Sequence, residues 1–578
     1  MNEFRVWASL PEKVEVQVGS ERHAMTRDAN GWWSAGVELA GAGSDYGFVL
    51  DGEGPFPDPR SPWQPEGVHG LSRVVDQGAF AWTDEAFRAP PLGGAVIYEL
   101  HIGTFMPEGT FAAAIGRLDH LVKLGVTHVE VMPVNAYPGA HGWGYDGVGL
   151  FATQHAYGGP EGLKQFVNAC HGRGLAVLLD VVYNHLGPTG NYLGKYAPYF
   201  TKRHHTPWGA ALNFDGPDSD EVRRFFCDNA LMWLRDYHFD GLRLDAVHAI
   251  VDTTARPFLE QLAGEVKGLS ARLGRPLAVI AESDLNDPRL VWPTQRGGFG
   301  MDAQWSDDFH HALHTVLTGE HDGYYEDFRG LADLAKALRQ AYVYDGAHSR
   351  HRRRCHGRPP LGLSGHRFLA YAQNHDQIGN RAQGERLNHL VSPGRVKIAA
   401  ALVFTSPFIP MIFQGEEWAA SSPFQYFTNH PEPELAKAVR EGRRREFAAF
   451  GWKPEEVPDP QERETFERSK LKWEELAQSP HDAMLEWHRQ LIQLRRAELV
   501  LTDGVLEEIN VRFNESEKWL VVERGPLTVA CNLAEAPRKL ALSAGLHRVV
   551  LASGDDCSFT EGSIQLPPDA VAILKREA

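Results

Sequence analysis

Three carboxylates, Asp245, Glu282 and Asp376, stand at or just beyond the ends of apolar stretches of the sequence. A carboxylate that stays ionised can attack an electrophilic carbon, whereas a carboxyl group that keeps its proton can donate it to a leaving oxygen. Two carboxyl groups whose pKa values are pushed apart in this way are the machinery of a retaining glycosidase. The three carboxylates therefore predict acid–base chemistry at a carbohydrate bond.

The local sequence gives Asp245 and Glu282 different surroundings. Arg243 lies two positions before Asp245, so on a strand both side chains project from one face and the guanidinium stabilises an ionised carboxylate. Glu282 follows Val279-Ile280-Ala281, and apolar neighbours raise the pKa of a carboxyl group. We therefore predict Asp245 as the nucleophile and Glu282 as the general acid, while Asp376 binds sugar hydroxyls and favours the distorted ring of the transition state.

Further polar and aromatic residues are predicted to bind substrate. They are Tyr145, Asp146, Asp180, His185, Arg243, His248 and His375. For Asp180 a supporting role is favoured, in which its carboxylate orients Arg243. Trp143 and Tyr145 fit core packing and a flat platform for sugar rings equally well. A single acidic residue at a strand end is more often a helix cap than a catalyst, so the prediction depends on several such strand ends meeting in one place.

Strands and helices alternate through the middle of the chain. Apolar residues recur at helical spacing in 110–124, 160–172, 219–237 and 256–271. Eight stretches are predicted as strands, at 95–100, 127–132, 176–181, 240–245, 277–282, 302–306, 368–373 and 408–413. So many alternations over roughly 400 residues are typical of a closed (β/α)₈ TIM barrel, in which functional groups gather at the carboxyl ends of the strands.

The two ends of the chain carry a different pattern, in which short alternating segments are separated by turn-forming residues. This pattern predicts an N-terminal immunoglobulin-like β-sandwich at 1–90 and a C-terminal β-sandwich at 498–578, with the catalytic barrel at 91–497 between them. The stretch 185–218 is rich in Gly, Pro, Asn and Tyr and too long for an ordinary loop, so it predicts a small subdomain inserted in the barrel.

The composition excludes several classes of function. The formal net charge of -17 repels polyanions, so no nucleic-acid partner is expected. No apolar run is long enough to cross a membrane and no signal peptide is apparent, so no membrane partner is expected either. Five cysteines without CxxC spacing predict reduced thiols and a cytoplasmic location. The basic run 350–358 is interpreted as a flexible, solvated loop.

Four motifs carry the most specific information. They are Asp180-Val181-Val182-Tyr183-Asn184-His185, Gly241-Leu242-Arg243-Leu244-Asp245-Ala246, Ala281-Glu282-Ser283 and Asn374-His375-Asp376-Gln377. In order and separation they resemble the signature regions of glycoside hydrolase family 13, the α-amylase family. The resemblance implies Asp245 as nucleophile, Glu282 as acid/base and Asp376 as transition-state stabiliser. It also implies that the sugar at the cleavage point is surrounded by His185, Arg243 and His375.

Further motifs resemble those family members that act beside a terminal trehalose. These motifs occupy 184–192 and 282–289, together with Asp307-Asp308-Phe309-His310-His311-Ala312 and Gly442-Arg443-Arg444-Arg445-Glu446-Phe447. Such members hydrolyse the α-1,4 bond next to the trehalose of a maltooligosyltrehalose and release trehalose and a maltooligosaccharide. The resemblance therefore implies maltooligosyltrehalose and α-1,4-glucan oligosaccharides as partners, and no cofactor is expected.

Two alternative functions were weighed. A 1,4-α-glucan branching enzyme shares the nucleophile and acid but passes the glycosyl group to a sugar; in that enzyme a Ser precedes the His and a Glu follows the Asp, unlike Asn374-His375-Asp376-Gln377. A non-catalytic glucan-binding scaffold is disfavoured because all three carboxylates are retained. His248 is followed by Ala249 where many α-amylases carry Lys then His, so their contacts to reducing-side sugars are not transferred. Calcium ligands are not identifiable in 186–218, so no metal is predicted.

Overall fold

Eight parallel strands close into a barrel in the middle of the chain. The computed structural model describes residues 2–38, 40–206, 208–448, 452–554, 556–560 and 562–577. The barrel strands are β9 (Ile97–Leu100), β10 (His128–Val131), β13 (Ala176–Val181), β16 (Gly241–Leu244), β17 (Ala278–Ala281), β18 (Ala303–Trp305), β21 (Phe368–Ala370) and β22 (Ile409–Phe413). Each pairs in parallel with its neighbour, and β22 closes the ring on β9. All eight stretches predicted as strands contain a barrel strand, and the predicted fold class is confirmed.

Helices surround the barrel. The main ones are α3 (Leu118–Leu124), α4 (Gly159–His171), α6 (Ser219–Asp236), α7 (Phe258–Leu273), α8 (Asp307–Thr318), α9 (Leu331–Gln340), α12 (Pro393–Thr405) and α15 (His481–Ala497). The single helix expected at 110–124 is instead two, α2 (Phe111–Ile115) and α3, which are separated by Gly116 and Arg117. Glycine is a poor helix former, which weakens the helix at this point.

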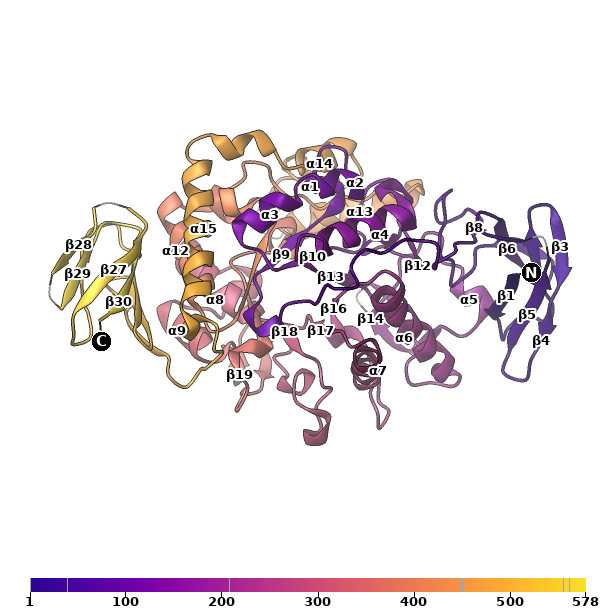
Figure 1. Ribbon diagram of the computed structural model, residues 1–578, viewed down its shortest axis with the longest axis horizontal. Coiled ribbons are helices and arrows are strands. Elements are labelled where there is room, and N and C mark those ends of the chain that lie inside the picture. The colour runs from indigo at the N-terminus through magenta and orange to yellow at the C-terminus, as the bar shows by residue number, and fades with distance from the viewer. Residues whose placement is uncertain are drawn as a thin grey trace.

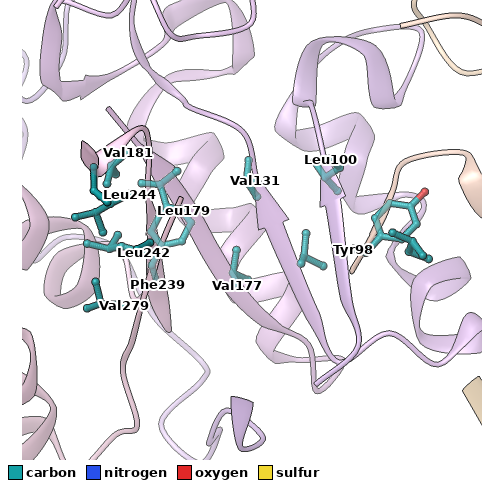
Figure 2. Packing of buried hydrophobic residues seen from close by; sticks show 14 of the residues in the cluster. Tyr98, Leu100, Val131, Val177, Leu179, Val181, Phe239, Leu242, Leu244 and Val279 are labelled. Carbon is teal, nitrogen blue, oxygen red and sulfur yellow. The ribbon is translucent and has the colours of Figure 1, made fainter. Parts of the chain in front are cut away.

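Side chains of the barrel strands alternate between two separate cores. One set packs outward against the helices and includes Leu100, Val131, Leu179, Leu244 and Val279, as Figure 2 shows. The other set fills the inside of the barrel with Ile97, Leu178, Ile280, Trp305, Leu369 and Met411. Because the side-chain period of a strand is two residues, the position of one residue fixes the direction of all others on that strand.

Antiparallel sheets flank the barrel at its two ends. At the N-terminal end β1 (Asn2–Trp7), β5 (Trp32–Val37) and β4 (Thr26–Arg27) form one sheet, and β3 (Glu21–Ala24), β2 (Val14–Val18), β6 (Asp45–Leu50), β7 (Glu53–Phe56) and β8 (Ser72–Arg73) form a second. At the C-terminal end the strands are β23 (Asn510–Asn514), β24 (Trp519–Arg524), β25 (Leu527–Asn532), β26 (Arg538–Ala541), β27 (His547–Ala552), β28 (Ser558–Thr560), β29 (Ser563–Leu566) and β30 (Ala570–Arg576). Figure 1 shows these two groups of sheets at opposite ends of the molecule. The domain boundaries at 90 and 497 stay a prediction.

The stretch 185–218 contains the short helix α5 (Leu193–Tyr196) and a hairpin of β14 (Phe200–Thr206) and β15 (Gly209–Leu212). It contacts the N-terminal sheets, since the Tyr196 hydroxyl donates to the carbonyl of Pro57 at 2.8 Å. Smaller elements lie in other loops: α1 (Ile102–Phe105), β11 (Asn135–Ala136), β12 (Gly149–Thr153), α10 (His375–Gly379), α11 (Leu387–Leu390), α13 (Pro433–Ala448) and α14 (Arg463–Arg468). Of the helices in the described ranges, none is long and apolar enough to cross a membrane.

The interpretation of the basic run 350–358 as a loop is wrong, whereas the expectation that it is solvated is confirmed for Arg350, Arg353, Arg354 and Arg358, which are exposed. This run is the turn and second strand of an antiparallel hairpin formed by β19 (Asp345–Ser349) and β20 (Arg354–Gly357). The carboxylate of Asp327 accepts from the backbone N–H of Arg350 at 2.9 Å, and Arg352 pairs with Asp284 at 2.9 Å. Asp284 neutralises Arg352, and Asp327 fixes the turn through the backbone; both carboxylates are far from the run in sequence, so the run alone does not reveal them.

Candidate active site

Alternation along the barrel strands directs several polar side chains into the mouth of the barrel. Asp180 on β13 lies in register with Arg243 on β16. Asp245 and Glu282 directly follow β16 and β17 and continue the inward-facing series of each strand. Apolar members of the same series fill the barrel beneath them. The four polar residues therefore form a layer at the carboxyl ends of the strands, where barrel enzymes hold their chemistry.

Arg243 is the centre of this layer. Its Nη1 donates to both carboxylate oxygens of Asp180, at 2.8 and 2.7 Å, and to Oδ1 of Asp245 at 2.9 Å. Its Nη2 lies 3.5 Å from Oε2 of Glu282. The side chain is 2% exposed, and the guanidinium lies over the ring of Trp305 at 4.2 Å from the centroid. One buried cation thus contacts three carboxyl groups and fixes their relative positions.

Two donors hold the carboxylate of Asp245. Besides Arg243, the Nδ2 of Asn184 donates to its Oδ2 at 2.7 Å and to its backbone carbonyl at 2.8 Å. The Oδ1 of Asn184 in turn contacts Nδ1 of His185, whose ring stacks on Trp208 with centroids 5.2 Å apart. The Asp245 side chain remains 14% exposed. The carboxylate is therefore fixed in place but still open to a substrate.

Glu282 has the properties of a general acid. Burial raises the pKa of Glu282 well above its ordinary value; Arg243 opposes this effect, and the charges of Asp245 and Asp307 raise the pKa further. Its Oε2 accepts a hydrogen bond from the backbone N–H of Ala246 at 2.5 Å. A carboxyl group that keeps its proton at the working pH can protonate a leaving oxygen. The direction of this shift agrees with the sequence expectation.

Asp376 lies on α10, directly beyond β21. The helix begins with a capping box: the side chain of Asn374 accepts from the backbone of Asp376 at 2.9 Å and of Gln377 at 3.2 Å, and Gln377 bonds back to the Asn374 N–H at 2.9 Å. The Asp376 side chain is exposed, and the Nδ2 of Asn380 donates to its Oδ1 at 2.7 Å. The cap and this amide together set the direction of the carboxylate.

His375 and Tyr145 join α10 to the layer of carboxylates. The Tyr145 hydroxyl donates to Asp180 Oδ2 at 2.5 Å and lies 2.8 Å from Nε2 of His375, and the two rings stack with centroids 5.2 Å apart. The Nδ1 of His375 contacts the buried carboxylate of Glu99 on β9. Burial lowers the pKa of His375, but the Glu99 carboxylate outweighs it, so the pKa is raised overall. Tyr145 therefore belongs to the polar layer at the barrel mouth.

Trp143 and Asp146 lie farther from the layer. The Trp143 side chain is 5% exposed, stacks on Phe424 and donates its indole N–H to the carbonyl of Gln425 at 3.0 Å. This packing favours the core interpretation for Trp143. Asp146 lies 3.7 Å from Nε2 of His430, and burial raises its pKa although the His430 charge opposes the shift. Asp146 thus contacts a loop beyond β22, and within the described residues no hydrogen bond joins it to Asp245, Glu282 or Asp376.

A second polar cluster beside Glu282 was missed by the sequence analysis. Arg352, from the basic run, lies 2.9 Å from Asp284 Oδ2, and His248 lies 3.8 Å from Asp284 Oδ1. Burial raises the pKa of Asp284, but the charges of His248 and Arg352 outweigh it and the pKa is lowered overall. The available signal was the spacing of Asp284, two residues beyond Glu282. Of the predicted residues, His248 is brought into this cluster.

Two further carboxyl groups, Asp307 and Glu99, were also missed by the sequence analysis. Asp307, at the first position of α8, accepts from the Tyr371 hydroxyl at 2.6 Å, and burial raises its pKa to about 6. Burial likewise raises the pKa of Asp180 to about 6, against the opposing charge of Arg243. Glu99 stands inside an otherwise apolar strand, which was a signal in the sequence. These groups place a dense set of carboxyls around one arginine.

Comparisons with known proteins agree with this geometry. A family model described as "Alpha amylase, catalytic domain" matches residues 76–208, and one described as a domain of unknown function matches residues 506–573. A malto-oligosyltrehalose trehalohydrolase of Arthrobacter ramosus is 50% identical, over 99% of this chain and 99% of its own. A 1,4-alpha-glucan branching enzyme of Xanthomonas campestris is 28% identical over only 54% of this chain and 48% of its own.

A solved structure is similar along the whole chain. It belongs to a protein of Salmonella typhimurium described as an alpha amylase, which is 38% identical, with a TM-score of 0.91 and coverage of 99% of this chain and 97% of that one. Half of the aligned positions are identical in the trehalohydrolase, over 99% of this chain, whereas the similarity to the branching enzyme covers only 54% of it. The chain belongs to the malto-oligosyltrehalose trehalohydrolases, within the α-amylase family.

Proposed function

We propose that the protein hydrolyses the α-1,4-glucosidic bond next to the terminal trehalose of a maltooligosyltrehalose, with retention of configuration. The observation that carries this proposal is the contact of one buried arginine, Arg243, with Asp245 at 2.9 Å and Glu282 at 3.5 Å. Its substrate class is supported by similarity to a trehalohydrolase over 99% of the chain. The maltooligosyl part is the group transferred, and trehalose is the leaving group.

In the first step Asp245 attacks the anomeric carbon of the maltooligosyl unit. The bond from this carbon to the trehalose oxygen breaks, and Glu282 gives that oxygen its proton, so trehalose leaves as a neutral sugar. Burial and the neighbouring carboxylates keep the Glu282 proton in place until this step. Arg243 and Asn184 hold the Asp245 carboxylate in position for attack.

In the second step water replaces trehalose. Glu282, now ionised, takes a proton from the water, whose oxygen attacks the anomeric carbon and displaces Asp245. The maltooligosaccharide leaves and Glu282 is again protonated. Asp376 binds sugar hydroxyls and favours the distorted ring in both steps, and Tyr145, His185 and His375 surround the same sugar. Asp180 orients Arg243 through two hydrogen bonds of 2.8 and 2.7 Å.

Hydrolysis is preferred to branching for this chain. A branching enzyme would pass the maltooligosyl group to the hydroxyl of another glucan. The motif Asn374-His375-Asp376-Gln377 differs from the Ser and Glu expected around the His and Asp of a branching enzyme, and the branching relative matches only 54% of the chain. We also propose a cytoplasmic location, supported by the buried thiols of Cys170, Cys227 and Cys531.

Time-resolved ¹H NMR of maltotriosyltrehalose hydrolysis tests this function. We expect trehalose and α-maltotriose to appear first, with the β anomer arising only later by mutarotation, because two displacements at one carbon restore its configuration. Initial release of the β anomer would contradict the covalent mechanism. New α-1,6 signals without free trehalose, in a parallel incubation with amylose, would instead support branching.

Asp307 is expected to set the position of the alkaline limb of the pH–activity profile. Because the charge of Asp307 raises the pKa of Glu282, Asp307→Asn is expected to lower that pKa, and Glu282 then loses its catalytic proton at a lower pH. The alkaline limb of the kcat/KM profile should therefore move down by about half a pH unit. Asp322→Asn, which changes an exposed carboxylate beyond α8, is the control and should leave the limb in place. An upward shift, or none, would remove Asp307 from this role.

A further inference from the structure

The motif Gly442-Arg443-Arg444-Arg445-Glu446-Phe447 lies on α13, a helix beyond the last barrel strand. Phe447 is the one buried residue of this helix among those the structure describes. The arginines of α13 differ in exposure: Arg445 has a side chain that is 74% exposed, with its carboxylate partner 4.0 Å away, whereas Arg440, Arg443 and Arg444 are partly buried. No residue of α13 has a role in the proposed catalytic mechanism. Its arginines therefore need a separate explanation.

Arg443 differs from Arg445. Its side chain is only 12% exposed and its guanidinium lies against the rings of Tyr426 and Phe447, at 5.0 and 4.8 Å from the centroids. Rings on two sides restrict the directions in which its N–H groups can point. The arginine is therefore held rigidly, at the cost of removing most of its charge from water.

The donors of Arg443 are directed at the far end of α10, the helix that carries Asp376. Its Nη2 donates to the backbone carbonyl of Gly379 at 2.6 Å, and its Nη1 donates to Oδ1 of Asn380 at 3.1 Å and to Glu446 at 3.3 Å. Helix ends carry carbonyl groups without partners inside the helix. Arg443 thus satisfies the end of a helix of five residues.

The contact with Asn380 also decides which way its amide faces. An arginine has donors and no acceptor, so it can face the oxygen of the amide but not the nitrogen. With Oδ1 fixed against Arg443, the Nδ2 must face the opposite side, where it donates to Asp376 Oδ1 at 2.7 Å. Without the arginine the amide oxygen loses the donor that holds it, and only the Asp376 carboxylate itself then orients the amide.

Asp376 depends strongly on this amide. Within the part of the chain that the structure describes, Asn380 supplies the one hydrogen bond to its carboxylate, and the side chain is otherwise exposed. On its other side α10 packs closely against Trp143. A Cβ atom added at Gly379 would lie only 2.0 Å from the Trp143 ring. Arg443 and Trp143 therefore hold α10 from two sides.

We propose that Arg443 is a positioning residue that sets the direction of the Asp376 carboxylate through the amide of Asn380. This inference rests on the proposed role of Asp376 as transition-state stabiliser. A carboxylate that is misdirected by a fraction of an ångström binds the distorted sugar less well than the relaxed one. Loss of Arg443 therefore lowers kcat more than it changes KM.

The test is a double-substitution cycle on the full chain. Arg443→Met keeps the apolar stem between the rings and removes all donors, and we expect it to lower kcat by about tenfold or more with a change in KM of less than about threefold. In the Asn380→Ala background the same substitution should change kcat by less than about twofold, because the amide through which it acts is absent. Arg445→Met is the matched control and should keep wild-type kcat.

Thermal unfolding of each variant separates positioning from stability. Equal losses of kcat on removing Arg443 in the wild-type and Asn380→Ala backgrounds would overturn the proposal, and so would a lowered melting temperature with unchanged kcat. All rates are ratios to the wild-type enzyme on the same substrate. If the wild-type enzyme cleaves a different α-glucan, the proposed function fails. The double-substitution cycle can then be measured on that glucan, so failure of the function and failure of the role of Arg443 are distinguishable.

Discussion

Asp245→Asn is expected to lower turnover of maltotriosyltrehalose by about 10⁴-fold or more, because an amide cannot form the covalent bond to the anomeric carbon. The replacement has the same shape, and its Oδ1 can still accept from Arg243, which lies 2.9 Å from that oxygen in the wild type. Substrate affinity, measured by calorimetry, should therefore stay within about tenfold of wild type. Single-turnover kinetics provide the rate.

Chemical rescue makes this prediction specific to the nucleophile. In Asp245→Ala the space left by the carboxylate admits azide, which should restore part of the turnover and give a β-glycosyl azide by one direct displacement, while Glu282 protonates the departing trehalose. Asp322→Asn, an exposed carboxylate, controls for the loss of an acidic side chain. Near-full activity of Asp245→Asn, or an α-glycosyl azide from Asp245→Ala, would refute the role given to Asp245.

Glu282→Gln is expected to have an effect of similar size on the natural substrate, about 10³-fold or more, because no proton is then available for the trehalose oxygen. The defect in the first step should be far smaller with α-maltosyl fluoride, whose leaving group needs no proton. With that substrate the first step remains fast, whereas water attack lacks its base. We therefore expect a burst of fluoride and an accumulated glycosyl enzyme, detected by mass spectrometry as maltosyl attached to Asp245.

The control for this experiment is Glu326→Gln, which changes an exposed glutamate outside the barrel mouth and should show neither burst nor loss. An equal loss in the rate of the first step on the fluoride and on maltotriosyltrehalose would mean that Glu282 does more than transfer protons. Retention of full activity on maltotriosyltrehalose would exclude it as the acid.

The barrel could be predicted from the alternation of strands and helices, and its central layer from the two-residue period of side chains along a strand. Once Asp245 is placed at the end of a buried strand, Arg243 must share its face, and the structure joins them at 2.9 Å. The reasoning for Glu282 was less complete. Val279 and Ala281 pack outward with the helices while Ile280 faces the barrel interior, so the raised pKa of Glu282 owes more to burial in the mouth and to nearby carboxylates.

Contacts between distant parts of the chain could not be predicted in this way. Tyr145 and His375 are 230 residues apart, and Glu99 and His375 are 276 apart, yet both pairs meet at the barrel mouth. A closed barrel brings its first and last strands together, but the sequence does not state which loop side chains then touch. The sequence alone therefore does not distinguish core packing from sugar binding for Tyr145, and it does not reveal that its hydroxyl donates to Asp180 at 2.5 Å.

The hairpin that carries Arg352 is a second example of this limit. A run of like charges is usually solvated. The hairpin is held by Asp327 and Asp284, which approach the run from other loops. The same holds for α13, whose arginines look alike in the sequence. Burial between two rings distinguishes Arg443 from the exposed Arg445, and that difference arises from packing beyond the helix itself.

The most direct test of the central claim is the ratio of kcat/KM for maltotriosyltrehalose to that for maltopentaose, with both products quantified. The two substrates have the same number of glucose units and differ at the terminal linkage. We expect the trehalose-terminated substrate to be preferred by at least about 100-fold, with trehalose and maltotriose released in equal amounts. Equal kcat/KM values, or cleavage of maltotriosyltrehalose without release of trehalose, would contradict the proposed function.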